Sequence, residues 1–371
     1  MASRRIVALI LFCSATATAA DLDRVREMKK EMLSSRRVAA PQAQTTTKTV
    51  NVDCTKGEKI QDAVDKNAAP LDILVHGICV ESVTIRAKDF TLRGTDPMTD
   101  GIQGVAGGAA LRATHLESAL IENLGFVNSA GSSFIAEHAD AVNMNNCRVV
   151  GNQRGIQIGA DSNFIGNGLT VTSNAGRAFW ANGARFVGCN ACNFSGNGGF
   201  TGTSLRGSIV TFLDSEVIAT NGIQAITDAY IDVDCLSVIS THTCSLQASN
   251  FAAIASQQAQ AALFGSGDFT GKLFADDHAD LYVLGARQIT GTGNSFDSFA
   301  TLWVEPLEDE NNVVQQSRIN GALLTGFVRA LVRDQSTLNG AIQCQSASDA
   351  WLDATVIRTP GSSVTGCEHA N

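Results

Sequence analysis

Short runs of alternating apolar and polar residues recur along most of this chain, and Gly and Asn separate them. Examples are residues 155–158 (Gly-Ile-Gln-Ile), 169–172 (Leu-Thr-Val-Thr) and 229–233 (Ala-Tyr-Ile-Asp-Val). Alternation with a period of two predicts β-strands, because successive side chains of a strand point to opposite faces. Runs this short cannot bury an apolar face alone. The pattern therefore predicts strands that stack on neighbouring copies of themselves.

A frame of polar residues gives the length of one repeat. Asn152, Asn174, Asn197 and Asn221 lie 22, 23 and 24 residues apart. The residues seven, five and three positions before them are Asn145, Cys147 and Val149; Asn167, Leu169 and Val171; Asn190, Cys192 and Phe194; and Asp214, Glu216 and Ile218. A strand and an amide at fixed places in each round indicate a solenoid. Asn suits the bends, and stacked amides can hydrogen-bond along the axis.

We predict an all-β fold, a right-handed single-stranded parallel β-helix with roughly a dozen rounds, since parallel crossovers are right-handed. The alternative is an α/β solenoid such as a leucine-rich repeat, but the Leu frame and the helical half-repeats are missing. Two segments depart from the frame. Residues 249–265 are rich in Ala and Gln and predict a helical excursion, and residues 305–312 (EPLEDENN) predict an acidic loop between rounds.

The Asn-x6-Asn frame, the Gly-Ile-x-Ile strands and residues 51–67 (NVDCTKGEKIQDAVDKN) resemble the pectin-lyase-like superfamily of right-handed parallel β-helices. The resemblance covers roughly residues 50–360. It implies an N-terminal capping helix, and Ile60, Ala63 and Val64 have the spacing of a helix that lays one face on the first round. It also implies an acidic polysaccharide as substrate. The aspartate motifs of the hydrolases, the lyase Trp-Ile-Asp-His and the epimerase Asp-Pro-His-Asp are all absent.

The N-terminal region predicts export. Residues 1–20 have the arginines, the apolar run and the small-residue cleavage site of a secretory signal. No later segment has the ~18 apolar residues of a membrane span. Residues 21–49 predict an amphipathic helical arm (21–40) and a polar linker, and residues 50–371 the β-helix domain with its caps. The arm is either solvated or a means of self-association. We expect a secreted or periplasmic protein.

Charge and cysteines narrow the partners. The formal net charge is −9, and removal of the signal, which carries two arginines, makes the chain more acidic. This disfavours nucleic acid unless a local basic patch forms.

Cysteines of exported proteins usually pair, and we expect the disulfides Cys54–Cys79, Cys235–Cys244 and Cys344–Cys367. Cys147 and Cys192 are interpreted as core residues, and an odd total leaves one free thiol. Cys189-x2-Cys192 has no second pair that would make a zinc site.

Candidate site residues fall into three groups. Arg148, His138 and Asp140 are candidates for catalysis: Arg148 is the one charge in its outward column, and His-Ala-Asp recurs at residues 138–140 and 278–280. A substrate-binding groove is predicted at Arg154, Arg177, Trp180, Arg185 and Arg206, because guanidinium groups bind sugar carboxylates and aromatic rings stack on sugars. Asp276, Asp277 and Asp280 could contribute to a Ca²⁺ site, although Ca²⁺ requires six or more oxygens. For each group a structural role is the alternative.

These observations favour an exported β-helix protein that binds an acidic polysaccharide on its lateral face. The sequence leaves open whether it also cleaves the polymer as a lyase or a hydrolase. The alternative is a non-catalytic surface, matrix or adhesion protein, which the small and mostly neutral outward columns support. Fold alone does not decide between them.

Overall fold

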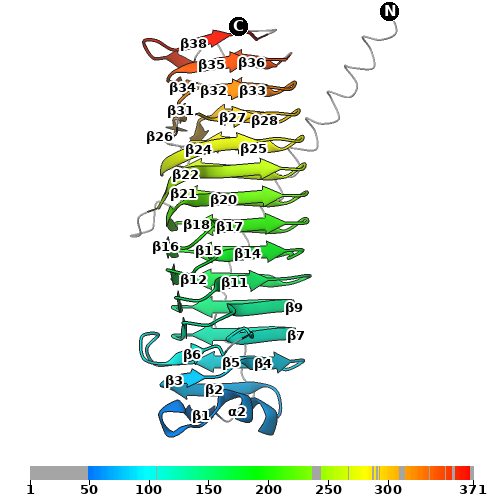
Figure 1. Cartoon of the computed structure of the whole chain (residues 1–371), viewed down its shortest axis with the longest axis vertical. Coiled ribbons are helices and arrows are strands. Elements are labelled where there is room, and N and C mark those ends of the chain that lie inside the picture. The colour runs from blue at the N-terminus through cyan, green and yellow to red at the C-terminus, as the bar shows by residue number, and fades with distance from the viewer. Residues whose placement is uncertain are drawn as a thin grey trace, which may run out of the picture. The chain divides into compact units, whose positions relative to one another are not determined.

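A computed structural model shows that the alternating segments form a parallel β-solenoid (Figure 1). It describes residues 49–367 except 106, 236–243, 266, 286–287, 290, 292, 309–313, 334, 347 and 353–355. The predicted signal and helical arm lie outside the described residues. About 12 rounds stack along the axis, and the predicted parallel β-helix is confirmed. No helix in the described part of the chain is long and apolar enough to span a membrane.

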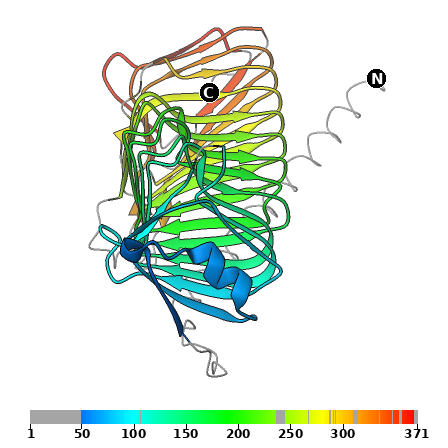
Figure 2. The same cartoon turned by 60° about the horizontal axis from the view of Figure 1, so that its bottom comes forward.

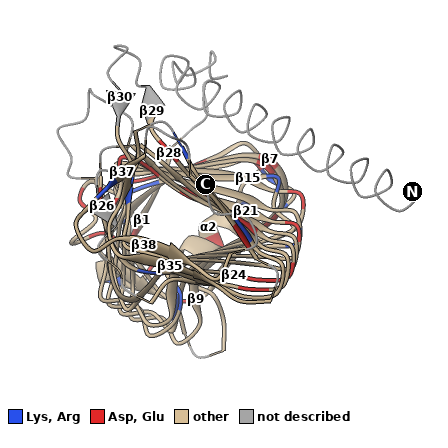
Figure 3. Cartoon of the chain, turned by 90° about the horizontal axis from the view of Figure 1, so that it is seen from above, with Lys and Arg blue, Asp and Glu red and all other residues tan. Residues whose placement is uncertain are grey.

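Each round contributes strands to three faces, and each face is a parallel β-sheet. The view along the axis in Figure 3 shows these faces around the core. Face A contains β1 (Thr49–Asp53), β2 (Leu71–His76), β5 (Phe90–Arg93), the second halves of β7 (Leu111–Glu122) and β9 (Ser132–Asn145), β12 (Asn163–Asn167), β15 (Phe186–Asn190), β18 (Ile209–Leu213), β21 (Tyr230–Cys235), β23 (Gln260–Gly265), β25 (Asp280–Leu284), β28 (Thr301–Glu305), β33 (Arg329–Val332) and β36 (Asp349–Leu352).

Face B contains β3 (Ile78–Val80), β6 (Gly101–Gln103), β8 (Gly125–Val127), β10 (Arg148–Val150), β13 (Thr170–Thr172), β16 (Asn193–Ser195), β19 (Glu216–Ala219), the first parts of β22 (Ser245–Ser256) and β24 (Asp268–Ala275), and β26 (Gln288–Ile289). A separate sheet is formed by β31 (Arg318–Ile319), β34 (Thr337–Leu338) and β37 (Ile357–Arg358).

Face C contains β4 (Val83–Arg86), the first parts of β7 and β9, β11 (Arg154–Ile158), β14 (Phe179–Asn182), β17 (Phe200–Leu205), β20 (Asn221–Ile226), the last parts of β22 and β24, β27 (Ser295–Phe296), β32 (Ala322–Leu324), β35 (Ala341–Cys344) and β38 (Ser363–Thr365). An antiparallel pair, β29 (Leu307–Glu308) and β30 (Val314–Gln315), occurs where the acidic loop was expected.

A short helix lies at the N-terminal end of the stack (Figure 2). It is α2 (Ile60–Lys66), preceded by the 3-10 turn η1 (Cys54–Lys56). Its buried residues are the predicted Ile60, Ala63 and Val64. The buried carboxylate of Glu81 accepts hydrogen bonds from the backbone N–H groups of Ile60 and Gln61, at 2.7 and 3.1 Å. These bonds satisfy donors that a helix N-terminus leaves unpaired.

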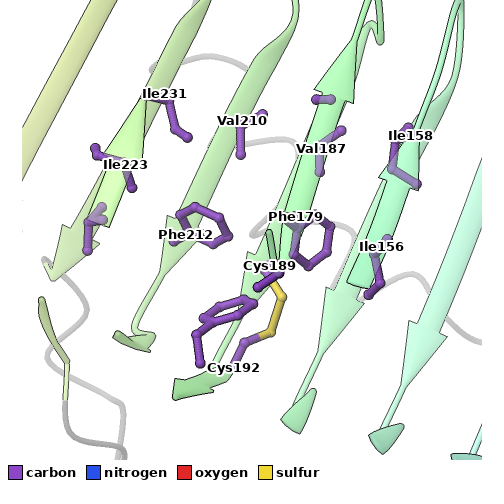
Figure 4. Packing of buried hydrophobic residues seen from close by; sticks show 14 of the residues in the cluster. Ile156, Ile158, Phe179, Val187, Cys189, Cys192, Val210, Phe212, Ile223 and Ile231 are labelled. Atoms are coloured by element: carbon purple, nitrogen blue, oxygen red, sulfur yellow. A yellow bond between two sulfur atoms is a disulfide. The ribbon is translucent and has the colours of Figure 1, made fainter. Parts of the chain in front are cut away.

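The interior is filled by side chains that point inward from all three faces (Figure 4). Phe179 and Phe212 lie with ring centroids 6.0 Å apart, in an edge-to-face arrangement that aromatic pairs favour. Gly202 leaves room for this packing, since a Cβ there would lie 2.5 Å from the Phe212 ring.

The predicted amide ladder is confirmed for three of its four asparagines. The Asn152 side-chain amide donates to Asn174 Oδ1 at 3.0 Å, and that of Asn174 donates to Asn197 Oδ1 at 2.8 Å. Asn221 was assigned wrongly to this column, because it lies in β20 on face C opposite Phe200. The fourth round is one residue shorter than the frame assumes. Val217, not Ile218, is therefore the inward residue of β19, and Ile218 is 42% exposed.

The predicted helical excursion at residues 249–265 is also wrong. The segment forms the end of β22 and all of β23. Ala and Gln favour helices when a segment is isolated, but Ala253, Ala255 and Ala261 point into the solenoid core and are fully buried. Packing against neighbouring rounds outweighs this local preference.

Candidate functional site

Face C carries two arginines beside a tryptophan on its outer surface. Phe179 is buried in the core, so alternation turns Trp180 outward. The Arg177 guanidinium carbon lies 6.0 Å from the centroid of the Trp180 ring. Arg154 is aligned with Arg177 one round away, because Gly155 N–H donates to Arg177 C=O at 2.9 Å. The structure thus brings together three of the five predicted substrate-binding residues.

Arg154 and Arg177 have no acidic partner within the part of the chain that the structure describes. None of the salt bridges between described residues includes Arg154 or Arg177. Partial burial and the neighbouring charge of Arg154 lower the pKa of Arg177. The first cause is the loss of water around the guanidinium group, and the second is repulsion between the two positive charges. An anion bound between the two guanidinium groups would relieve this repulsion.

Three buried polar atoms lie in one column beside these arginines. Strand register aligns Trp180, Thr203 and Gln224 in successive rounds of face C. Trp180 Nε1, Thr203 Oγ1 and Gln224 Oε1 are buried and have no hydrogen-bond partner in this structure. Thr203 is 0% exposed and the three atoms are shielded from a surface polymer, so we assign this column a structural role. We call Arg154, Arg177 and Trp180 the face C site.

The other two predicted binding arginines lie at the corner between faces C and A. Arg185 Nη1 lies 3.2 Å from Asp140 Oδ1, and both side chains are more than half exposed. Arg206 has a φ of 53° in the turn after β17. The candidate groove is therefore divided between a face and a corner, and Arg185 already has a carboxylate partner.

The three catalytic candidates do not converge. His138 lies at the corner with its Nδ1 3.7 Å from Asp161 Oδ2 and its ring centroid 5.0 Å from that of His115. Asp140 pairs with Arg185. Arg148 belongs to β10 on face B, where its register partners are Gly125 and Thr170. The proposed roles of His138, Asp140 and Arg148 thus gain no common site.

The predicted metal ligands have separate hydrogen-bonding partners. Asp276 and Asp277 lie in the turn before β25, and Asp280 begins that strand. Asp277 Oδ1 lies 3.4 Å from His278 Nδ1, whereas Asp280 accepts hydrogen bonds from Gln260 and Tyr282, each at 3.4 Å. Among the described residues, no three His, Cys, Asp or Glu side chains are placed to hold a metal ion.

The outer side of face A carries a buried cluster that the sequence did not indicate. Both tyrosines of the chain are in it. Tyr230 donates to Asp232 at 2.8 Å, and Tyr282 donates to Asp280. Burial raises the pKa of Tyr230, with contributions from Asp232, and burial also raises that of Asp280. Asp232 is 0% and Tyr282 3% exposed. These groups are shielded from a surface polymer, so we assign them a structural role.

The cysteines confirm the predicted pairs and add one. Cys54–Cys79, Cys235–Cys244 and Cys344–Cys367 are disulfides. Cys192 was interpreted as an unpaired core residue, which is wrong, because it is bonded to Cys189 across the corner between β15 and β16. Cys147 is the free cysteine of the described residues, and burial raises the pKa of its thiol to about 12.

Comparisons with known proteins add little. No model of a known protein family matches the chain, and no curated protein is similar to it in sequence. Among solved structures, it is similar to an Arg-to-Ala mutant of AlyGC, an alginate lyase of family PL6. The TM-score is 0.27 and the identity 11%, over 86% of this chain and 71% of that one. This likeness concerns the fold alone.

Proposed function

We propose that the protein binds an acidic polysaccharide along the outer surface of face C. The observation that carries the proposal is the alignment of Arg154 and Arg177 in adjacent rounds beside Trp180, without a carboxylate partner among the described residues. A guanidinium group forms two parallel hydrogen bonds to a carboxylate. A uronate-type sugar supplies that carboxylate and also a ring face that can stack on Trp180.

The net charge of −9 means that a polyanion must find such a local basic site, since the molecule as a whole repels it.

Four disulfides among the described residues support a place outside the cytoplasm, because such bonds persist in oxidising compartments. We therefore propose that the protein is exported and meets its polysaccharide outside the cell or in the periplasm. Detection of the protein in the culture medium or periplasmic fraction, with loss of residues 1–20, tests this part separately.

The test of binding is isothermal calorimetry of purified protein with oligogalacturonate and oligoalginate. We expect Arg177→Ala and Arg154→Ala each to weaken binding roughly ten-fold or more, since hydrogen bonds to a charged group contribute about 1.5–3 kcal/mol. Arg185→Ala is the matched control, because it removes the same charge from the neighbouring corner, where Asp140 already pairs with it. Equal losses in all three variants, or no binding of any acidic oligosaccharide by the wild type, would refute the proposal.

Cleavage is the second candidate, because Arg154 and Arg177 beside Trp180 could neutralise a uronate carboxylate and so ease removal of the neighbouring proton. Ultraviolet absorbance of unsaturated uronate products should then increase with wild type and not with Arg177→Ala. New reducing ends without that absorbance indicate hydrolysis. Binding without either product indicates the non-catalytic carbohydrate-binding protein.

A further inference from the structure

Three aromatic side chains form a stack on the corner between faces C and A, far from the face C site in sequence. Register aligns His278, Phe299 and Phe327 in successive rounds, through hydrogen bonds from His278 N to Ser298 O and from Phe299 N to Gly326 O. The ring centroids of His278 and Phe299 are 4.8 Å apart, and those of Phe299 and Phe327 are 5.2 Å apart. Their planes differ by 13° and 7°. We call these three residues the corner stack.

The corner stack exposes two large apolar side chains. Phe299 is 52% exposed and Phe327 58% exposed, so neither ring is buried by its own fold. Both residues have positive φ angles, 67° and 65°, but this corner has such angles in other rounds as well, at Asp161 (55°), Arg206 (53°) and Gln258 (62°). The turn is therefore a general feature of the solenoid, and polar residues make it elsewhere. Two adjacent exposed aromatic rings at this place are typical of a surface that binds a partner.

Carboxylates border the stack and restrict what it can bind. Asp277 and Asp297 lie in the turns that hold His278 and Phe299, and Asp297 accepts a hydrogen bond from Ser298 N at 2.7 Å. Asp276 belongs to the same group, and burial together with the charges of Asp277 and Asp297 raises its pKa. These acids repel an acidic polymer. They also disfavour a purely apolar partner, which would remove them from water.

A neutral sugar meets both conditions. Its ring presents a face of C–H groups that stacks on an aromatic ring, and its hydroxyls donate hydrogen bonds to carboxylates. Phe299 has a ring neighbour on each side, whereas Phe327 has one, on the side of Phe299, among the described residues. Phe327 N donates to Ser346 O, so the next round places a small serine and not a ring on the other side of Phe327, which is 58% exposed. That side of the Phe327 ring is the platform on which a sugar ring can continue the stack.

We propose that the corner stack is a binding site for a neutral polysaccharide, with Phe327 as the stacking platform and Asp297 as an acceptor for sugar hydroxyls. This site is separate from the face C site and has the opposite charge. The protein would thus hold an acidic and a neutral polysaccharide at once, which goes beyond the proposed function and does not depend on it.

Affinity electrophoresis tests the proposal with the purified protein in gels containing glucomannan, xylan, hydroxyethylcellulose or galactan. We expect at least one of these neutral polymers to retard the wild type, and Phe327→Ala to weaken binding ten-fold or more. Phe327→Trp should retain binding, because a larger ring offers the same platform. Ile357→Ala is the matched control, since it also truncates a half-exposed apolar side chain, 47% exposed, outside the stack.

The outcomes separate this proposal from the one on face C. Arg177→Ala should leave retardation by the neutral polymer unchanged, and Phe327→Ala should leave binding of acidic oligosaccharides unchanged. The proposal is overturned if no neutral polymer retards the wild type, or if Phe327→Ala and Phe299→Ala are retarded as strongly as the wild type. It is equally overturned if Phe327→Ala changes the elution volume in size-exclusion chromatography, which would assign the stack to contacts between copies of the protein.

Discussion

At the scale of single residues, the buried amide ladder should be a large contribution to stability. Asn174 is 1% exposed; its amide donates to Asn197 Oδ1 and to Val149 O, and its Oδ1 accepts from the backbone N–H and the amide of Asn152. Asn174→Ala leaves several buried groups unpaired, and we expect it to lower the free energy of unfolding by about 3 kcal/mol. Urea denaturation measures this loss.

The control for Asn174 is Asn167, which belongs to a similar ladder on the outer side of face A. Its amide donates to Asn145 Oδ1 at 2.9 Å, but the side chain is only half-buried. Water can replace a bond lost there, so Asn167→Ala should lower the free energy of unfolding by less than about 1 kcal/mol. Equal losses for the two variants would show that burial does not set the value of the ladder.

Asp100 should make the stability depend on pH in acid. Burial raises its pKa, but hydrogen bonds from Thr95, Gly77 and Asp96 outweigh this effect and lower it to about 2 from 3.8. A carboxyl group with a lowered folded-state pKa stabilises the fold above pH 3.8, and that contribution is lost as the pH falls through about 2. We expect Asp100→Asn to be less stable than the wild type at pH 7, with a difference that shrinks below pH 3.8.

Thermal unfolding of the wild type and Asp100→Asn across this range measures the effect. Asp62→Asn is the control, because Asp62 is exposed on α2. A difference that stays constant from pH 7 into acid would mean that the negative charge of Asp100 contributes nothing.

At the scale of elements, period-two alternation predicted strands correctly wherever inward and outward side chains differ in polarity. It failed where composition and packing disagree, as at residues 249–265, whose alanines suit either a helix or a crowded core. It also failed at β19, where Val217 and Ile218 are both apolar, so the pattern fits either register and the assumed period decided wrongly. In both segments, packing against neighbouring rounds determines the structure, and a short stretch of sequence does not contain that information.

The candidate site could likewise be predicted from the sequence only in part. Spacing along the chain indicated that arginines recur once per round with Trp180 near them, and the structure brings Arg154, Arg177 and Trp180 together. Spacing could not show that Arg185 lies at the corner between faces C and A, where it forms a salt bridge with Asp140. The sequence also did not indicate that Thr203 and Gln224 continue the outward column of Trp180, because the repeat frame covers face B and not face C.

At the scale of the whole molecule, a solenoid is stabilised mainly by contacts between adjacent rounds, so its ends should be the weakest parts. Disulfides lie at both ends, since Cys54–Cys79 ties η1 to β3 and Cys344–Cys367 ties β35 to the chain that follows β38. Each closes a loop of similar length, with sequence separations of 25 and 23. Chain entropy predicts that each disulfide contributes about 3 kcal/mol to the free energy of unfolding.

We expect Cys344→Ser with Cys367→Ser to increase amide hydrogen exchange in β35, β36 and β38 and to leave β12 and β15 protected. Cys54→Ser with Cys79→Ser is the matched control and should loosen β1 to β3 instead. If either double variant increases exchange uniformly along all rounds, the solenoid unfolds as one cooperative unit, and the nearest-neighbour description of its stability is wrong.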